Sequence, residues 1–380
     1  MIARSIESPI HAHSRPRQTS PGELRVSIPP ESVARLVKAG HAIRVQAGAG
    51  TRAGFPDDSY ASAGATVTDA ERVYEGAELV CRVQPPSADE IVAIPRGAAL
   101  LSLLHPGRNS ALLDALAKHG VTALALELVP RITRAQSMDV LSSQSTVAGY
   151  KAVLIGASAL PKFLPMLTTA AGNVSPAKVF VIGAGVAGLQ AIATARRLGG
   201  VVSAFDVRPA AREQVLSLGA TFVANDLVAA GAETAGGYAR AQSADETERT
   251  RAALAAHVKD VDLVVTTAQI PGRPAPRLLT AEMVASMRAG AVIVDLAAES
   301  GGNCDLTLAG ETVQSGNVTI IGPVNVPATV PFHASQMFGK NILALVTQLS
   351  AKDGTLSLDA DPEIIGAMTV VRDGSVVPRP

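Results

Sequence analysis

The chain has 380 residues, enough for two domains of ordinary size, and its 33 basic residues balance 33 acidic ones. This balance indicates no electrostatic attraction to nucleic acid or to an anionic membrane. Aromatic residues make up only 3% and tryptophan is absent, which argues against the aromatic platforms that bind single-stranded nucleic acid. No apolar run is long enough for a membrane-spanning helix, and Met1–Glu23 lacks the apolar core of a secretory signal. Cys81 and Cys304 lie far apart, so we expect structural thiols in a reducing cytoplasmic setting.

The first part of the chain alternates between short apolar stretches and helical stretches. Residues 1–22 are polar and proline-bearing, so we expect a flexible leader. Beyond it, the repeated β–α spacing predicts a parallel sheet packed between helices. The expected strands are Ile43–Gln46, Glu78–Val83, Ala98–His105 and Thr122–Glu127, and the expected helices are Ser32–Ala39, Ser59–Gly64 and Ser110–His119.

The strongest motif of the sequence is Val179–Gly188, which reads VFVIGAGVAG. An apolar, mostly β-branched strand leads into G-x-G-x-x-G and then into a helical stretch, which is the context that the dinucleotide-binding fingerprint requires. Gly183 would allow the tight turn, Gly185 would let the backbone approach a pyrophosphate, and Gly188 would let helix and strand pack closely. The phosphates would bind at the helix N-terminus. The alternative is that these glycines serve ordinary helix–strand packing.

The strand after this motif, Val201–Phe205, ends at Asp206, where a ribose-binding acid is expected. Asp206 should accept hydrogen bonds from both hydroxyls of the adenosine ribose, and its charge would repel a 2′-phosphate. Alternatively, it could only cap the following turn. Arg208 could instead accept a 2′-phosphate, but the aspartate favours NAD. We expect further backbone or apolar contacts to the cofactor from Val186, Gly237, Ala268 and Gln269.

A long insertion follows the second strand of this part, between Asp226 and Val258. Loops of this length inside a compact domain are usually functional or disordered. Tyr238, which follows two glycines, reads as the tip of a mobile flap that closes over bound nucleotide and excludes water. The alternative is a tyrosine that anchors a disordered loop. The second half of the insertion is charged and helical.

The remaining elements predict the fold class, which is α/β with two doubly wound, Rossmann-like parallel-sheet domains separated by a cleft and joined by long helices. Strands at Leu263–Thr267, Ala291–Leu296 and Val318–Ile321 continue the second sheet, and the tail Ala367–Val377 predicts a hairpin. We expect a first domain of residues 23–141 plus 335–380. The NAD-binding domain is expected at 142–334, with connecting helices at about 142–163 and 335–349.

The stretch PRITRAQSMDVLSSQSTVAGY (Pro130–Tyr150), together with the glycine motif, resembles one family closely. The sequence is similar to the NAD(H)-binding component, domain I, of proton-translocating NAD(P) transhydrogenase, a family related to alanine dehydrogenase. The resemblance covers roughly residues 20–380. Other shared stretches are AGAETAGGYA, TTAQIPGRPAP, VIVDLAAESGGNC, GPVNVP and AMTVVRDGSVV. The sequence departs from the family at Ile10–Ser20, where weak strand character replaces an apolar first strand.

The resemblance implies a set of partners. The family's domain I binds NAD(H) and forms a homodimer, a separate domain II spans the membrane, and domain III binds NADP(H). Hydride passes directly between the two nicotinamides, coupled to proton translocation. We therefore expect a cytoplasmic subunit, associated peripherally with the inner membrane through its partner subunits, that uses NAD and no metal.

Direct transfer between two nicotinamides requires positioning more than a tuned general base. The resemblance assigns this task to Arg131, Gln136, Asp139 and Ser142, with Tyr238 of the flap as a further catalytic residue. Arg131 would donate to the nicotinamide amide oxygen or to phosphate. Asp139 would accept from the amide and orient Arg131, and Gln136 would bridge a ribose hydroxyl to the partner domain. The alternative is a solvated linker that carries a helix-capping pattern.

The rival hypothesis is an amino-acid dehydrogenase of the alanine dehydrogenase type. Such enzymes hold the substrate with an arginine and a lysine and use a histidine as acid/base catalyst. Arg25 and His105 match the arginine and the histidine, but Gln84 stands at the lysine position and Glu299 at the catalytic aspartate position. Glutamine provides neither the ion pair nor the proton of lysine, so we expect His105 to be structural. A non-catalytic NAD-binding module remains a third hypothesis.

Overall fold

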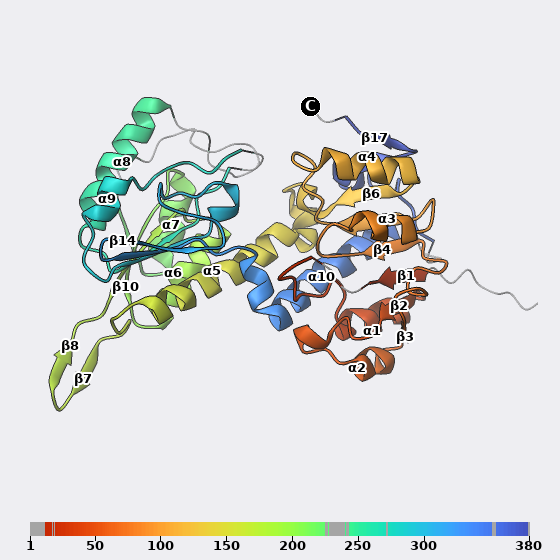
Figure 1. The fold of residues 1–380 in the computed structure, drawn as a ribbon, viewed down its shortest axis with the longest axis horizontal. Helices are drawn as coiled ribbons and strands as arrows, with labels where there is room; N and C mark the ends of the chain where they lie inside the picture. Colours follow the sequence, from red (N-terminus) through yellow and green to blue (C-terminus); the bar gives the residue numbers. More distant parts are fainter. Residues whose placement is uncertain are drawn as a thin grey trace, which may run out of the picture. The chain divides into compact units, whose positions relative to one another are not determined.

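The computed structural model describes residues 12–16, 18, 20–224, 227, 240, 243–270, 273–351 and 355–378. It contains two compact units, Met1–Gln144 with Ala328–Pro380 (the first unit) and Ser145–Pro327 (the second unit). Each unit has helices packed on a central sheet (Figure 1). The chain passes from one unit to the other after residues 144 and 327, and the domain limits placed at 141 and 334 stay a prediction.

The first unit is built on a sheet whose strands follow the spatial order β17-β16-β6-β5-β4-β1-β2-β3. The strands β1 to β6 are parallel, and β16 and β17 add an antiparallel edge. Counted from β3, the parallel strands have the order of a doubly wound fold. The bounds are β1 (Ala12–Arg15), β2 (Ala42–Gln46), β3 (Thr66–Thr68), β4 (Leu79–Cys81), β5 (Ala99–Ser102), β6 (Thr122–Ala125), β16 (Thr369–Arg372) and β17 (Ser375–Val376).

The prediction of a flexible leader at residues 1–22 is wrong for residues 12–15. These residues form β1, which pairs with both β2 and β4 in the middle of the sheet. The sequence AHSR has no apolar pattern. Strand pairing, however, uses main-chain N–H and C=O groups, which every residue other than proline supplies. At the other end of the chain, the predicted hairpin is confirmed, because β16 and β17 pair on either side of Asp373 and Gly374.

Helices cover both faces of the first sheet. On one face, α1 and α10 share a core with Leu79, Cys81 and Leu101, and on the other, α3 and α4 pack on Val80 and Leu100. Neighbouring residues of one strand thus enter opposite cores, as the pleat requires. The helical elements are α1 (Pro30–Lys38), η1 (Thr51–Ala53), α2 (Asp57–Ser62), α3 (Ala88–Ala93), α4 (Ser110–His119), η2 (Leu126–Leu128), η3 (Thr133–Met138), α10 (Pro331–Leu349) and α11 (Ile365–Met368).

The second unit repeats the doubly wound order, β11-β10-β9-β12-β13-β15, and adds β14 as an antiparallel edge strand. Its apolar strands are buried on both faces, as in most parallel sheets. The bounds are β9 (Lys178–Ile182), β10 (Val201–Phe205), β11 (Thr221–Phe222), β12 (Leu263–Thr266), β13 (Val292–Asp295), β14 (Thr312–Ser315) and β15 (Val318–Ile321). The predicted fold class of two doubly wound parallel-sheet units is confirmed.

Helices of the second unit also divide between the two faces of its sheet. The helices α5, α6 and α7 pack with Val179 and Val181, whereas α8 and α9 pack with Phe180 and Ile182. A capping box between Ser243 and Glu246 starts α8. The helical elements are α5 (Val140–Ala159), α6 (Val186–Arg197), α7 (Pro209–Ser217), α8 (Ala244–Val258), α9 (Ala281–Ala285), η5 (Ala298–Ser300) and η6 (Val326–Thr329).

Both predicted connecting helices have different bounds in the structure. The stretch predicted as a helix over 142–163 is α5, which begins at Val140 after a capping aspartate and ends at Ala159, before Pro161. The helix predicted over 335–349 is α10, which begins at Pro331, because proline suits the first helical position. Among the residues that the structure describes, no helix is long and apolar enough to span a bilayer.

Among the elements of the second unit that were not predicted is a hairpin. The strands β7 (Leu167–Thr169) and β8 (Gly172–Val174) form a two-stranded hairpin that is separate from the seven-stranded sheet. The hairpin stands out from its unit (Figure 1, lower left). Its strands are mostly exposed, so the apolar signal that marks core strands is missing.

Candidate functional site

The glycine motif forms a tight turn between β9 and α6. Gly183 has a φ of 92°, and a Cβ atom there would lie 2.8 Å from Thr267 Oγ1. A Cβ atom on Gly188 would lie 1.8 Å from the carbonyl oxygen of Gly183, so the first turn of α6 packs directly on the glycine turn. Both positions therefore exclude larger residues for steric reasons.

The middle glycine of the motif faces open space. A Cβ atom on Gly185 would meet only Arg208 Nη2, at 3.9 Å. Gly185 is also the N-cap of α6, and no side chain caps this helix end. An uncapped helix N-terminus presents main-chain N–H groups and the positive end of the helix dipole. The turn therefore fits the pyrophosphate of a dinucleotide, which needs close backbone approach and such donors.

Asp206 follows β10 directly and is nearly buried beside the glycine turn. Its Oδ2 accepts a hydrogen bond from the main-chain N–H of Ala184 at 2.7 Å. Arg208 donates its main-chain N–H and Nε to Oδ1, at 2.8 and 3.0 Å, and Nη2 to Oδ2 at 2.9 Å. The structure thus places the predicted ribose-binding carboxylate at the turn and pairs it with Arg208.

The end of β12 forms the other side of this turn. Thr267 donates its main-chain N–H to Ile182 O and its hydroxyl to Gly183 O, both at 2.8 Å. Ala268 and Gln269 follow without regular secondary structure, and Gln269 Nε2 donates to Leu296 O at 3.0 Å. The sequence analysis missed Thr267, although it lies in the quoted stretch TTAQIPGRPAP.

A second group of predicted site residues lies in the first unit, on η3 and its flanks. The side chains of Arg131 and Gln136 are exposed, whereas Ala135 and Met138 are buried beneath them. Asn341 Nδ2, on α10, donates to the carbonyl oxygen of Ser137 at 2.8 Å. This loop therefore presents polar side chains from a backbone that is held from below.

Arg134 fastens the same loop to the segment that precedes α11. Its guanidinium forms ion pairs with Asp361 and Glu363. Gln348 Nε2, near the end of α10, also donates to the carboxylate of Asp361, at 3.2 Å. The loop is thus tied to residues more than 200 positions later in the chain.

Asp139 caps α5. Its Oδ1 accepts the main-chain N–H of Ser142 at 2.9 Å, and its Oδ2 accepts the Ser142 hydroxyl at 2.6 Å. An aspartate in this position satisfies an N–H group that has no partner within the helix. The helix-capping pattern of the alternative is therefore present at Asp139. Each carboxylate oxygen still offers lone pairs to a further donor.

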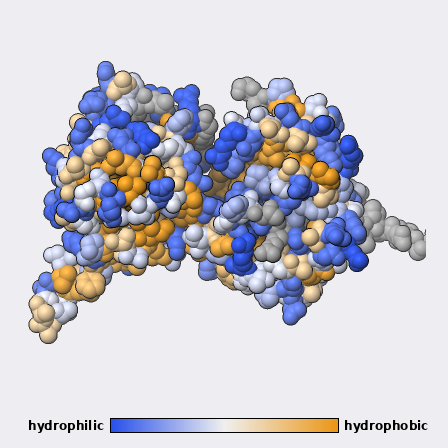
Figure 2. Space-filling view, in the orientation of Figure 1, coloured by the Kyte–Doolittle hydropathy of each residue, from blue (hydrophilic) through white to orange (hydrophobic). Residues whose placement is uncertain are grey.

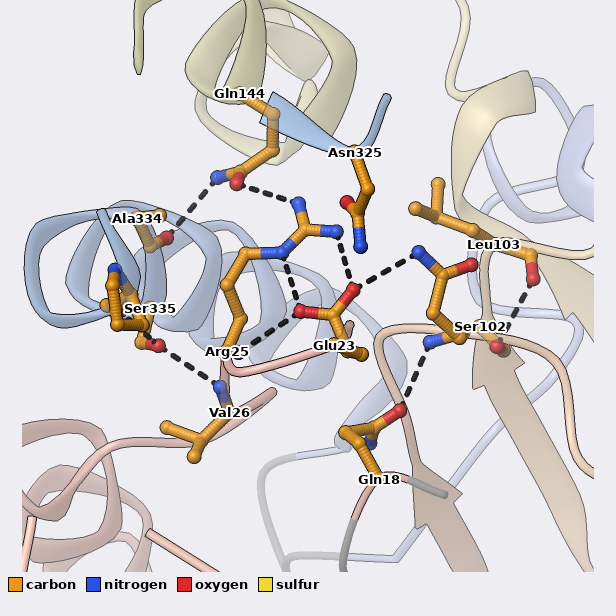
Figure 3. A network of polar contacts seen from close by, with 12 residues as sticks. Gln18, Glu23, Arg25, Val26, Ser102, Leu103, Gln144, Asn325, Ala334 and Ser335 are labelled. Atoms are coloured by element: carbon orange, nitrogen blue, oxygen red, sulfur yellow. Dashed lines mark hydrogen bonds and ion pairs between the residues drawn. The ribbon is translucent and has the colours of Figure 1, made fainter. Parts of the chain in front are cut away.

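Arg25, one residue of the rival hypothesis, lies in a network of polar contacts (Figure 3). Gln84, a second residue of that hypothesis, is partly buried and joins the network through Glu23. Arg25 is 3% exposed and donates Nε and Nη2 to Glu23 at 2.8 and 2.7 Å, and Nη1 to Gln144 Oε1 at 2.9 Å. Gln84 Nε2 also donates to Glu23, at 3.0 Å. Burial alone would raise the pKa of Glu23, but the hydrogen bonds and charge of Arg25 and the Gln84 amide lower it below its usual value. The sequence analysis missed Glu23.

His105, the third residue of the rival hypothesis, follows β5 with a φ of 49°. Its main-chain N–H donates to the carboxylate of Glu127, which also accepts the N–H of Leu104. Burial, together with the charge of Arg108, lowers the pKa of His105 to about 4. The imidazole is therefore neutral at physiological pH.

The predicted residues thus fall into two groups, each assembled within one unit. The second unit brings the three glycines, Asp206 and Ala268 together, with their neighbours Val186, Arg208 and Gln269. The first unit carries Arg131, Gln136, Asp139 and Ser142 on η3, on its flanks and at the start of α5. Gly237 and Tyr238 lie outside the described residues. Glu299, on η5, accepts the main-chain N–H of Asn325 at 3.3 Å. No cluster of three or more His, Cys, Asp and Glu residues occurs in the described part of the chain that could hold a metal ion.

Two family models match the chain. The N-terminal domain of alanine dehydrogenase/PNT matches residues 15–148, and the C-terminal domain of the same family matches residues 152–379. The chain is 46% identical over 370 residues to the first part of NAD(P) transhydrogenase subunit alpha of Rhodospirillum rubrum, covering 95% of this chain and 96% of that protein. The resemblance stated from the sequence motifs is confirmed.

Two further relatives separate the branches of this family. The structure of transhydrogenase from Sinorhizobium meliloti aligns with a TM-score of 0.84 and 43% identity, covering 97% of this chain and 99% of that one. Alanine dehydrogenase of Halomonas elongata is 31% identical over 374 residues, covering 96% of this chain and 94% of that protein. The identity is therefore higher to these transhydrogenases than to this alanine dehydrogenase.

Proposed function

Because the chain belongs to the alanine dehydrogenase/PNT family, we propose that it is the NAD(H)-binding subunit of a proton-translocating NAD(P) transhydrogenase. Hydride would pass directly between NAD(H) on this chain and NADP(H) on a partner subunit, and a membrane subunit would couple the transfer to proton movement. The 46% identity to a transhydrogenase subunit over nearly the whole chain supports this branch of the family.

The observation that carries the choice against an amino-acid dehydrogenase is the charge balance around Arg25. A site for an amino-acid or keto-acid carboxylate needs an excess of positive charge. Here the guanidinium of Arg25 is paired with the buried carboxylate of Glu23, and the neighbouring Gln84 is neutral. The three side chains together carry no net charge, so they offer no excess cation to a carboxylate.

The second unit would hold the dinucleotide. The open space at Gly185 and the uncapped start of α6 suit the pyrophosphate, and Ala268 and Gln269, which follow β12, would contact the rest of the cofactor. When bound, NAD(H) supplies the hydride carrier. The protein's part is to bind it, orient it and exclude water, which also fits the proposed flap role of Gly237 and Tyr238.

Asp206 supports NAD over NADP as the resident cofactor, because its carboxylate would repel a 2′-phosphate. It already accepts four hydrogen bonds, three of them from Arg208. Two carboxylate oxygens offer about four lone-pair sites. We infer that the guanidinium of Arg208 must release Asp206 before the ribose hydroxyls can bind there.

The loop of the first unit would position the nicotinamide. Arg131 and Gln136 are exposed on a backbone that is fixed by Asn341 and Arg134, so their side chains can contact a ligand without disordering the loop. Arg131 would donate to the carboxamide oxygen or to phosphate. Asp139, oriented by Ser142, would accept from the carboxamide NH2 group.

The partners follow from the same proposal. The chain would work as a homodimer that is attached peripherally to the cytoplasmic side of the inner membrane by the membrane-spanning and NADP(H)-binding subunits. The β7–β8 hairpin supports the dimer, because an isolated two-stranded hairpin is only marginally stable in water. Met166 and Phe163 beside it are 65% and 59% exposed, and Figure 2 shows apolar residues on and around the hairpin.

The test is reconstitution with an NADP(H)-binding transhydrogenase component. We expect hydride transfer from NADPH to an NAD analogue, followed by absorbance, only when both proteins are present. Arg131→Ala should lower this rate by roughly 100-fold, because misplaced reacting groups lose most of the benefit of orientation. Arg72→Ala, at an arginine exposed on the same unit, is the matched control and should leave the rate unchanged.

The same preparation tests the rival functions. Appreciable NADH formation from NAD and L-alanine would contradict the proposal and favour an amino-acid dehydrogenase. Tight NADH binding without any hydride transfer in the reconstituted system would favour a non-catalytic NAD-binding module.

A further inference from the structure

The side chain of Asn303 forms hydrogen bonds with the main chain of Ala268, one of the predicted cofactor contacts. It is fully buried and lies in the stretch GGNC, for which the proposed function gives no role. Its Nδ2 donates to Ala268 O at 2.8 Å and to Pro276 O at 2.9 Å, and its Oδ1 accepts the N–H of Ala268 at 3.0 Å. One side chain therefore satisfies both main-chain polar groups of Ala268.

A buried carboxylate in turn fixes the backbone that carries Asn303. Asp295, the last residue of β13, is fully buried. Its Oδ2 accepts the main-chain N–H groups of Asn303 and Cys304 at 2.7 and 3.1 Å, and the Thr307 hydroxyl at 2.7 Å. Its Oδ1 accepts the Thr266 hydroxyl at 2.8 Å and the N–H of Ala297 at 3.0 Å. Five hydrogen bonds hold this charge, and a fully satisfied buried network is rigid.

The network ends at the glycine turn. Thr267, next to Ala268, donates its hydroxyl to Gly183 O at 2.8 Å. A Cβ atom on Gly183 would lie only 3.0 Å from the main-chain nitrogen of Ala268. A shift of Ala268 would therefore alter the space directly beside the turn that is proposed to bind the pyrophosphate.

Regular secondary structure does not hold Ala268 in place. The strand β12 ends at Thr266, and residues 267–270 belong to no helix or strand. If such a segment were free to rotate, a ligand that orders it would lose binding free energy to the conformational entropy of the backbone. Asn303 provides this ordering before any ligand arrives, because its amide fixes both the N–H and the C=O of Ala268.

We propose that Asn303 is a positioning residue for the nicotinamide dinucleotide, and that Asp295 holds it in place. Asn303 sets the backbone of Ala268 and Gln269 at the edge of the cofactor site without contacting the cofactor itself. This inference rests on the proposed function, because it assumes that the glycine turn binds NAD(H).

The test compares substitutions at two buried polar residues: Asn303, which contacts the segment after β12, and Asp262, which precedes β12. Asn303→Ala removes the three side-chain hydrogen bonds, and Asn303→Asp keeps the side-chain volume but loses both amide donors. Asp262→Asn is the matched control: Asp262 is also buried, precedes β12 and accepts hydrogen bonds from Lys162 Nζ and the N–H of Lys178, both at 2.8 Å. For each variant, we would measure the NADH dissociation constant, the rise in Tm on adding NADH and the hydride-transfer rate at saturating NADH.

We expect both Asn303 variants to raise the NADH dissociation constant roughly tenfold or more and to lower the transfer rate at saturating NADH, because the site edge is misplaced. The NADH-induced rise in Tm, taken from each protein's own cofactor-free Tm, should shrink in these variants and stay normal in Asp262→Asn. Unaltered NADH affinity and transfer rate in a folded Asn303 variant would overturn the inference. A wild-type chain that does not bind NADH would instead contradict the proposed function.

Hydrogen exchange on the unsubstituted protein gives an independent result if the Asn303 variants do not fold. The amide of Ala268 should be protected before any cofactor is added, although it lies outside regular secondary structure. Rapid exchange at this amide in the cofactor-free protein would show that Asn303 does not hold the main chain of Ala268, and would overturn the proposal.

Discussion

In the sequence, His105 matches the catalytic histidine position of alanine dehydrogenases. In the structure, its environment favours the neutral imidazole. It is about two-thirds buried, its backbone has a positive φ, and its main-chain N–H is bound by Glu127. Burial and the charge of Arg108 lower its pKa to about 4, from an ordinary value of 6.5. The folded protein therefore binds this proton less readily than the unfolded chain does.

This difference predicts a pH dependence of stability. Between pH 6.5 and about 4, the unfolded chain binds more protons at His105 than the folded chain, so the free energy of unfolding falls as the pH decreases through this window. His105→Asn should remove this contribution, and asparagine tolerates a positive φ. We expect the variant to lose less stability than the wild type between pH 7 and pH 5, as measured by urea denaturation. Parallel losses in the two proteins would contradict the prediction.

Substitutions of Asp139 can separate a role in the helix α5 from a role in cofactor binding. Asp139 caps α5 and is also a proposed nicotinamide contact. Asp139→Ala should destabilise the protein by about 1 kcal/mol, the usual cost of losing an N-cap. Asp139→Asn should retain most of that stability, since asparagine also caps well, but should lower the hydride-transfer rate of the reconstituted system. If Asp139→Asn keeps the full transfer rate, the residue is only a cap.

Elements with a strong local signal could be predicted from the sequence. The strand β10 was predicted with its observed bounds, and the helix α4 likewise. Apolar strands are identified by their run of buried residues, and the end of α4 by Gly120. The starts of α5 and α10 lie earlier than predicted, because a capping aspartate and a proline at the first helical position extend the helices beyond their apolar pattern.

Elements and contacts without a local sequence signal could not be predicted. The strand β1 has no apolar alternation and forms because β2 and β4 lie on either side of it. The hairpin β7–β8 is exposed, so hydrophobic periodicity is absent. The site follows the same division: the glycine turn and Asp206 lie within one local motif, whereas Asn303 reaches Ala268 across 35 positions and no spacing rule indicates that contact.

At the scale of the whole molecule, the exposed apolar residues beside β7–β8 predict the oligomeric state. Phe163→Ser combined with Met166→Ser should shift the protein from dimer to monomer, because the exposed apolar area that favours association is removed. Val92→Ser, at an apolar residue of α3 that is even more exposed, is the control and should leave the mass unchanged. Light scattering coupled to size-exclusion chromatography measures this mass. A wild-type monomer would contradict the proposed homodimer.

The chain order of the two units has a consequence for biosynthesis. The second unit is continuous, whereas the first unit is completed only when β16 pairs with β6 and α10 packs on α1. Asn341 and Asp361, which hold the η3 loop, also emerge from the ribosome after the second unit. During synthesis, the glycine turn can therefore fold before the loop that presents Arg131 is fixed. If the proposed function holds, a nascent chain would acquire the ability to bind nucleotide first, and the ability to orient the nicotinamide only after α10 and the segment around Asp361 have been made.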